Sequence, residues 1–281
     1  MPEVLCSEEE RKEVTDSLCP LLEGLLRRGY LRRVSDALGI GLGYLHIEYL
    51  GRSGNTRALA KLRIDEESAS LRAHAWVGHG FRTEGRTKFD VAVYGRGESR
   101  RCYLSTCEKE GKAPPVNWLV SFSEAATSEA ESVLEELSSI NDPEVGELVN
   151  EVNKELSRRA WFDELVNKIL GGSALPILFT SLSKFRWGRH EVEVRTDYVD
   201  IGDEVSINFI PIYAYVKGGN LHLSASPKDN SLHIKITEEG TDLKKSLHRL
   251  KENLRLAKEF LRDNKALTKV ARTYSLAILY P

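Results

Sequence analysis

The segment Lys88-Phe89-Asp90-Val91-Ala92-Val93-Tyr94 carries the clearest structural pattern in the chain, because Phe89, Val91 and Val93 occupy alternate positions. Alternation of this kind is typical of a β-strand with one buried and one solvent-facing side. Similar segments lie before and after it, and their short connections predict an antiparallel meander. The strands expected in this region are 42–50, 57–64, 70–77, 87–94, 101–106 and 117–122.

Helical patterns flank the meander. Ser7 and Glu10 have the spacing of a capping box, which predicts a helix from residue 7, and Pro20 should kink or divide it. Further helices are expected at 30–38, 124–140, 142–171 and 241–264. A second set of strands is expected at 175–181, 185–195, 205–216, 221–226, 232–237 and 270–279.

These elements predict an α+β fold with two mainly antiparallel β-sheets, each packed with helices, and a helical middle segment. The expected divisions are an N-terminal α+β domain at 1–123, a helical connector at 124–171, and a C-terminal α+β domain at 172–281 with the long terminal helix. One internal repeat is a further hypothesis. Residues 43–47 and 61–67 resemble 219–223 and 233–239 in pattern, so a hairpin could be duplicated; chance similarity between hairpins is the alternative.

Composition narrows the class of protein. The chain has 281 residues, of which 41% are hydrophobic and 29% charged, as in globular proteins. It contains no glutamine and a single methionine, which is typical of thermophilic proteins. No apolar run reaches the roughly 20 residues that a membrane-spanning helix needs. The acidic N-terminal residues do not resemble a secretory signal, so we expect a cytoplasmic protein without a membrane partner.

The four cysteines stand at positions 6, 19, 102 and 107 and form no C-x-x-C pair, which argues against structural zinc. Cys102 and Cys107 are expected to share a strand, where their odd separation would direct them to opposite faces. We interpret the cysteines as buried small hydrophobic residues, with disulfides tolerated by a thermophile as the alternative.

The helix expected at 241–264 carries the strongest candidate binding feature. Leucines spaced by three and four residues form one apolar stripe, and basic side chains follow it one residue later. This basic row consists of Lys244, His248, Lys251, Arg255, Lys258 and Arg262. It would extend roughly 27 Å along the helix, which is long enough to follow several phosphates of a nucleic acid.

Other basic residues could extend such a surface, since Arg82, Arg86 and Lys88 lie beside Phe81. Arginine next to an aromatic ring suits phosphate contact combined with base stacking. The sequence therefore favours a non-catalytic protein that binds RNA or single strands, for example as a subunit of a ribonucleoprotein. The overall charge of −2 argues against this class, and the row could equally be the solvated side of an amphipathic helix.

Two other functions stay open. Asp90, Glu110 and Lys112 resemble the Asp and E-x-K residues of PD-(D/E)xK nucleases, which implies Mg²⁺ as cofactor. The resemblance is incomplete, because the expected strand ends before Glu110 and Cys107 occupies the nearer position. The basic helix could instead dock on the acidic helices at 124–170, either inside the molecule or in a second copy or another protein, as in an oligomeric scaffold. Outside the nuclease alternative we expect neither cofactor nor metal, and histidines such as His74 and His79 around Trp76 are interpreted as ordinary strand residues.

Overall fold

The structure is a computed structural model that describes residues 3–79, 82–158, 182–195, 198–203, 205–208, 212–214, 221–226, 230–237 and 242–279. The N-terminal part contains β1 (Glu3–Leu5), β2 (Tyr44–Ser53), β3 (Thr56–Ile64), β4 (Ser68–His79), β5 (Arg82–Tyr94) and β6 (Arg101–Gly111). The C-terminal part contains β7 (Ser183–Trp187), β8 (His190–Val194), β9 (Tyr198–Ile201), β10 (Val205–Asn208), β11 (Ile212–Ala214), β12 (Leu221–Ser226) and β13 (Ser231–Thr237). The helices are α1 (Glu8–Arg28), α2 (Tyr30–Leu38), α3 (Val116–Ser139), α4 (Glu144–Arg158), α6 (Leu243–Arg262) and α7 (Asn264–Leu279).

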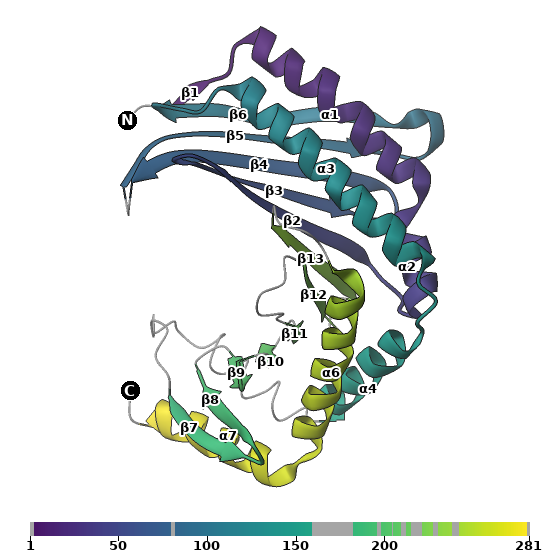
Figure 1. Cartoon of the computed structure of the whole chain (residues 1–281), viewed down its shortest axis with the longest axis vertical. Coiled ribbons are helices and arrows are strands. Elements are labelled where there is room, and N and C mark those ends of the chain that lie inside the picture. Colours follow the sequence, from purple (N-terminus) through teal and green to yellow (C-terminus); the bar gives the residue numbers. More distant parts are fainter. Residues whose placement is uncertain are drawn as a thin grey trace.

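The strands pair edge to edge in the order β1-β6-β5-β4-β3-β2-β13-β12-β11-β10-β9-β8-β7. Pairing is antiparallel within β1–β6 and within β7–β13, and the parallel pair of β2 with β13 joins the two groups. The predicted α+β class and its two antiparallel groups of strands are confirmed. Figure 1 shows that the series of strands curves strongly, so that it has a convex and a concave side.

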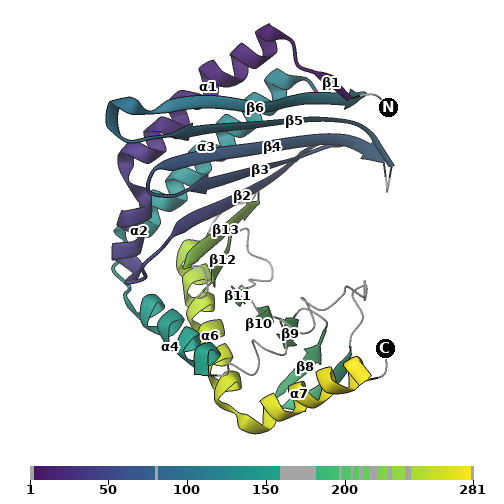
Figure 2. The ribbon, with the colours of Figure 1, turned by 180° about the vertical axis from the view of Figure 1, so that it is seen from behind.

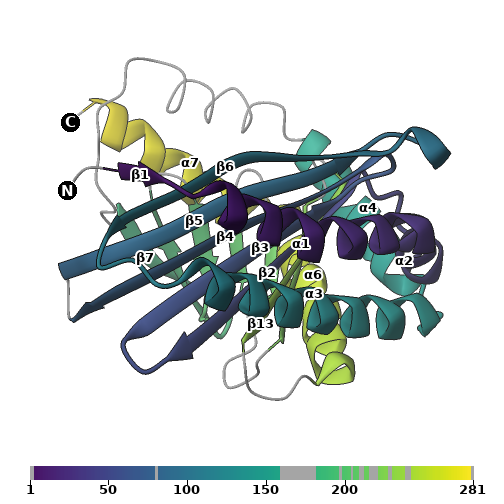
Figure 3. The same cartoon turned by 90° about the horizontal axis from the view of Figure 1, so that it is seen from above.

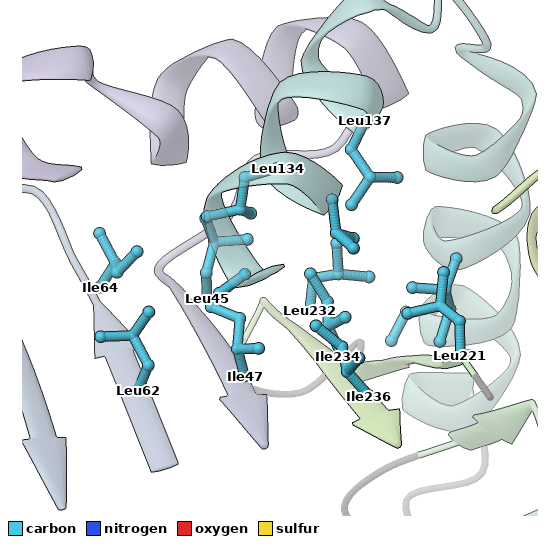
Figure 4. Packing of buried hydrophobic residues seen from close by; sticks show 14 of the residues in the cluster. Leu45, Ile47, Leu62, Ile64, Leu134, Leu137, Leu221, Leu232, Ile234 and Ile236 are labelled. Carbon is cyan, nitrogen blue, oxygen red and sulfur yellow. The ribbon is translucent and has the colours of Figure 1, made fainter. Parts of the chain in front are cut away.

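The helices cover the convex side. α1 and α3 lie across the N-terminal strands, and α6 lies against β10–β12, with α4 alongside it (Figures 2 and 3). The core lies between these layers, where leucine and isoleucine side chains from β2, β3, β12 and β13 meet α3 and α6. Figure 4 shows part of this cluster, with Leu45, Ile47, Leu62, Ile64, Leu134, Leu137, Leu221, Leu232, Ile234 and Ile236 labelled.

The two segments that resemble each other in sequence form hairpins with equivalent registers. Leu45 pairs with Ile64 in the β2–β3 hairpin, and Leu221 pairs with Ile236 in the β12–β13 hairpin. The four positions are those that the sequence comparison aligned, and all four side chains are buried. The β2–β3 and β12–β13 hairpins therefore resemble each other in structure as well as in sequence pattern.

Two predicted strands are helices in the structure. Residues 117–122 belong to the first turns of α3, whose buried positions begin with Val116, Leu119 and Val120. Residues 270–279 belong to α7, in which Ala266, Leu267 and Val270 are buried. Both segments are locally rich in apolar residues, and helical spacing decides between the two structures only when their neighbours are included.

Other helices and strands differ from the prediction in where they begin, end or divide. The capping box of Ser7 and Glu10 is confirmed, but Pro20 lies inside an undivided α1. The strand expected at 185–195 is a hairpin, β7–β8, with Gly188 in the turn at φ 57°. The strand expected at 175–181 and the end of the helix expected at 142–171 lie outside the described residues.

All four cysteines form disulfides, which corrects the interpretation of buried free thiols. Cys6 is bonded to Cys107, and Cys19 in α1 is bonded to Cys102. Both bonds attach the N-terminal segment to β6. The expected opposite orientation of Cys102 and Cys107 is wrong, because a β-bulge at Ser105 adds one residue to β6 and restores both cysteines to the helix-covered face.

The two disulfides close long loops, since the bonded cysteines are 101 and 83 residues apart in the sequence. A cross-link over a loop of this length stabilises a fold by about 4 kcal/mol in the chain-entropy model, and overlapping loops contribute less than the sum. Such bonds persist in oxidising compartments and inside hyperthermophiles. In the described part of the chain, no helix is both long and apolar enough to cross a membrane.

Reduction of both disulfides should lower the free energy of unfolding by about 2–5 kcal/mol, because the unfolded chain regains conformational freedom. Urea titrations with and without reductant measure this difference. Peptide mapping of the unreduced protein should recover Cys6 with Cys107 and Cys19 with Cys102. Four reactive thiols in the unreduced, unfolded protein would contradict the assignment.

Candidate nucleic-acid interface

The basic row of α6 faces α4. Lys251 Nζ lies 2.7 Å from Asp142 and 3.1 Å from Glu144, and Arg255 pairs with the same glutamate. Further along, Lys258 Nζ lies 2.6 Å from Glu151, and Arg262 lies 3.4 Å from Glu155. Four of the six basic residues are therefore paired with Asp142 or with carboxylates of α4.

The remaining two members lie in the first half of α6. Lys244 is exposed, and the His248 ring lies 3.4 Å from Glu252 of the same helix. Because neighbouring carboxylates offset most of the row, its field at the surface is much weaker than the sequence suggests. The alternative that this row contacts the acidic middle helices thus holds within one chain.

The position of α4 follows from a close backbone approach to the end of α2. A Cβ atom on Gly146 would lie 2.0 Å from the carbonyl oxygen of Gly39, so only glycine fits there. The amide of Asp142 also donates to the carbonyl of Ala37 over 2.9 Å. These contacts hold the acidic face of α4 against α6.

The ion pairs between α4 and α6 shift the pKa values of several of the side chains that form them. The hydrogen bond from Arg255 lowers the pKa of Glu144, and the one from Lys258 lowers the pKa of Glu151. The hydrogen bond to Asp142 raises the pKa of Lys251. These shifts favour the charged forms of Glu144, Glu151 and Lys251, as the docking of α6 on α4 requires.

The residues of the nuclease alternative are not brought together. Asp90 in β5 binds Arg72 at 2.8 Å, and Glu110 in β6 lies opposite Arg86, which comes four residues before Asp90 in β5. At 3.3 Å per residue this places the two carboxylates about 13 Å apart. Lys112 lies after β6, 3.6 Å from Glu84. Within the described residues no group of His, Cys, Asp or Glu is arranged to hold a metal ion.

Arg86 and Lys88 lie on the side of β5 that faces away from the helices, since the intervening Thr87 and Phe89 are buried. Of Arg82 only the backbone, at the start of β5, is described. We call the concave side of β2–β6 and β13 the open face. It is rich in charge, with Arg52, Arg57, Lys61, Arg63, Arg72, Arg86, Lys88 and Lys235 set against Glu48, Asp90, Glu108 and Glu110.

Most of the charges on the open face form cross-strand pairs. Lys61 lies 2.7 Å from Glu48, and Lys88 lies 2.6 Å from Glu108. Arg86 lies 2.5 Å from Glu110. The cations nevertheless outnumber the carboxylates, and Arg72 keeps 71% of its side chain exposed. The open face therefore retains a positive excess after the local pairs are counted.

One row across four strands concentrates this excess beside an aromatic ring. The cross-strand register places Arg52 opposite Arg57, Arg57 opposite Trp76, and Trp76 opposite Arg86. Like charges directly opposite each other destabilise a sheet, so the Arg52–Arg57 pair has a cost that an anionic ligand would remove. We call these four residues the Arg–Trp row.

A depression of about 540 Å³ lies beside the Arg–Trp row. Residues at this end of β3–β6 line it: Leu59, His74, Trp76, Thr83, Glu84, Gly85, Arg86 and Glu110. The His74 and Trp76 rings lie 5.2 Å apart. Burial is the main cause that lowers the pKa of His74, and the positive charges of Arg86 and Lys88 lower it further. His74 is therefore neutral at pH 7.

Aromatic side chains also gather at the opposite end of the open face. Tyr94 and Tyr103 are 51% and 50% exposed, and their rings lie 6.2 Å apart. Arg63 lies over the ring of Tyr44 at 4.1 Å. Aromatic and cationic groups thus occupy both ends of the same surface.

Sequence reasoning placed Arg86 and Lys88 at a binding surface but missed Arg57, His74 and Trp76. The sequence signal for these three residues is the alternation of apolar and polar side chains along β3 and β4, which places them on the side opposite the buried residues. The Arg–Trp row is visible only when the register between neighbouring strands is known. The short Gly54-Asn55 turn between β2 and β3 fixes that register locally.

Exchanging the charges of one α4–α6 pair tests whether the basic row is structural. Lys258→Glu should lower the melting temperature by a few degrees, since it places a carboxylate against Glu151. The double variant Lys258→Glu with Glu151→Lys should recover most of the loss. Thermal melts of the three proteins measure this coupling, and a double variant no more stable than the single one would contradict the pairing.

The pH dependence of stability should contain a contribution from Glu48. Hydrogen bonds from His46 and Lys61 lower its pKa from 4.5 to about 2. A folded-state pKa below the unfolded value stabilises the fold above pH 4.5, and this stabilisation is lost as the pH falls toward 2. Urea titrations of Glu48→Gln should therefore show a shallower pH dependence in this range than the wild type; identical slopes would exclude the contribution.

The chain was compared with protein-family models, with curated proteins and with solved structures. None of the three comparisons gave a match. The arrangement of side chains on the open face is therefore the basis for any functional assignment.

Proposed function

We propose that this protein binds single-stranded nucleic acid, RNA or DNA, on the open face, without catalysing a reaction on it. The Arg–Trp row is the observation that supports the proposal. Its arginines offer contacts to phosphates, and Trp76 offers a surface on which a base can stack. A role as a subunit of a ribonucleoprotein is consistent with this surface.

The shape and charge of the open face favour a single strand over a duplex. Single-strand binders combine a positive surface along the backbone with aromatic rings for successive bases. The open face has such rings at both ends, with Trp76 at one and Tyr94 and Tyr103 at the other. A base-paired helix keeps its bases stacked inside and could not use these rings.

The proposal differs from the sequence-based expectation in the surface that it uses. The sequence favours the α6 row as the binding surface, but four members of that row are paired with Asp142 or with α4. Arg86 and Lys88 carry over to the open face, where Arg57 joins them. The proposed site is therefore formed by strands, and α6 stabilises the fold behind it.

Removing one arginine of the row tests the proposal. Arg57→Ala should weaken binding of a fluorescein-labelled 20-mer single strand and should reduce the slope of log Kd against log salt by about 0.7, the value for one phosphate contact. Fluorescence anisotropy at several salt concentrations measures both quantities.

Arg32→Ala provides the matched control, because Arg32 lies on α2 with 90% of its side chain exposed and carries the same charge. This variant should bind like the wild type. Absence of binding by the wild type at low salt would refute the function. Equal losses in the two variants would show that net charge, and no specific surface, determines binding.

A further inference from the structure

The depression beside the Arg–Trp row has the chemical features of a pocket for one base. Leu59 and Trp76 supply apolar and aromatic surface, and Glu84 and Glu110 supply carboxylates. Arg86 also lines the depression, but it is paired with Glu110, so the described lining offers a phosphate no uncompensated cation. A flat, uncharged ring that can stack on Trp76 suits the pocket better. We call this depression the Trp76 pocket.

His74 contributes an unsatisfied polar atom. Its Nε2 is buried and has no hydrogen-bond partner within the described part of the chain. A buried polar atom without a partner costs free energy, and a ligand that reaches it would recover that cost. Because His74 is neutral, Nε2 can donate or accept according to the tautomer of the ring.

The carboxylates of the pocket discriminate between bases. Glu110 accepts from Arg86, and Glu84 lies 3.6 Å from Lys112. A carboxylate has about four acceptor positions, so a carboxylate that already forms an ion pair can also accept a hydrogen bond from a ligand. Adenine and cytosine carry an exocyclic amino donor where thymine and uracil carry a carbonyl oxygen. A carboxylate attracts the amino group and repels the carbonyl oxygen.

We propose that the Trp76 pocket receives one unstacked, amino-bearing base of the bound strand, adenine or cytosine in preference to thymine or uracil. This inference rests on the proposed function. The base stacks on the indole of Trp76, its amino group donates to Glu84 or Glu110, and its edge lies beside the His74 ring. The flanking phosphates lie along the arginines of the Arg–Trp row.

The test compares labelled 20-mers of dA, dC and dT at one salt concentration by fluorescence anisotropy. The wild type should bind dA and dC about fivefold or more tightly than dT, which corresponds to one good polar contact. Glu84→Ala should reduce this ratio, whereas Glu66→Ala, which removes an exposed carboxylate from the β3–β4 turn, should leave it unchanged.

Stacking is tested separately. Trp76→Ala should weaken binding of dA about fivefold or more, and Trp76→Phe, which keeps a ring, should lose less. A 2-aminopurine base within a dT 20-mer should lose fluorescence on binding to the wild type, a readout that requires no variant.

The outcomes separate the two proposals. Absence of binding to all three strands refutes the proposed function together with the pocket. Binding without preference among dA, dC and dT, with 2-aminopurine fluorescence unchanged, overturns the pocket alone.

Discussion

Parallel pairing of β2 with β13 is the constraint on which the architecture depends. Seven residues of each strand are in register, from Tyr44 opposite Ser231 to Leu50 opposite Thr237. Parallel neighbours need a long crossover, and the helical segments between them lie on one side of the strands (Figure 3). The pairing joins two antiparallel groups that would otherwise be separate sheets. It also continues the open face from β2 into β13.

The same arrangement decides which charges are available to a ligand. With the described helices on the convex side, α4 lies beside α6, and Asp142 and the carboxylates of α4 offset most of the basic row. Among the described residues of the open face, cations pair with carboxylates on neighbouring strands, as Lys61 does with Glu48 and Lys88 with Glu108. A chain with a net charge of −2 can therefore still present a positive surface, because its acidic residues are concentrated elsewhere.

Local patterns in the sequence were sufficient to predict the strands and helices that are joined by short connections. Alternation identified β2–β6, and the capping box identified the start of α1, because both depend on neighbouring residues. The apolar start of α3 and the segment that forms α7 were assigned as strands, since short apolar runs suit either structure. The disulfides were not predicted because the sequence does not reveal the β-bulge at Ser105. This one extra residue makes Cys102 point to the same side of the sheet as Cys107. The candidate site could be only partly predicted: the α4–α6 contact and the register that aligns Arg57 with Trp76 are tertiary properties.

We propose that a polyanion binds on the concave strands while the cations of α6 stabilise the fold. Ultraviolet cross-linking of a bound single strand, followed by mass spectrometry of the attached peptides, tests it most directly. The account requires cross-links in β3–β5, including the peptide that contains Trp76. Cross-links confined to residues 244–262 of α6 would contradict it, since they would place the strand on the surface that faces α4.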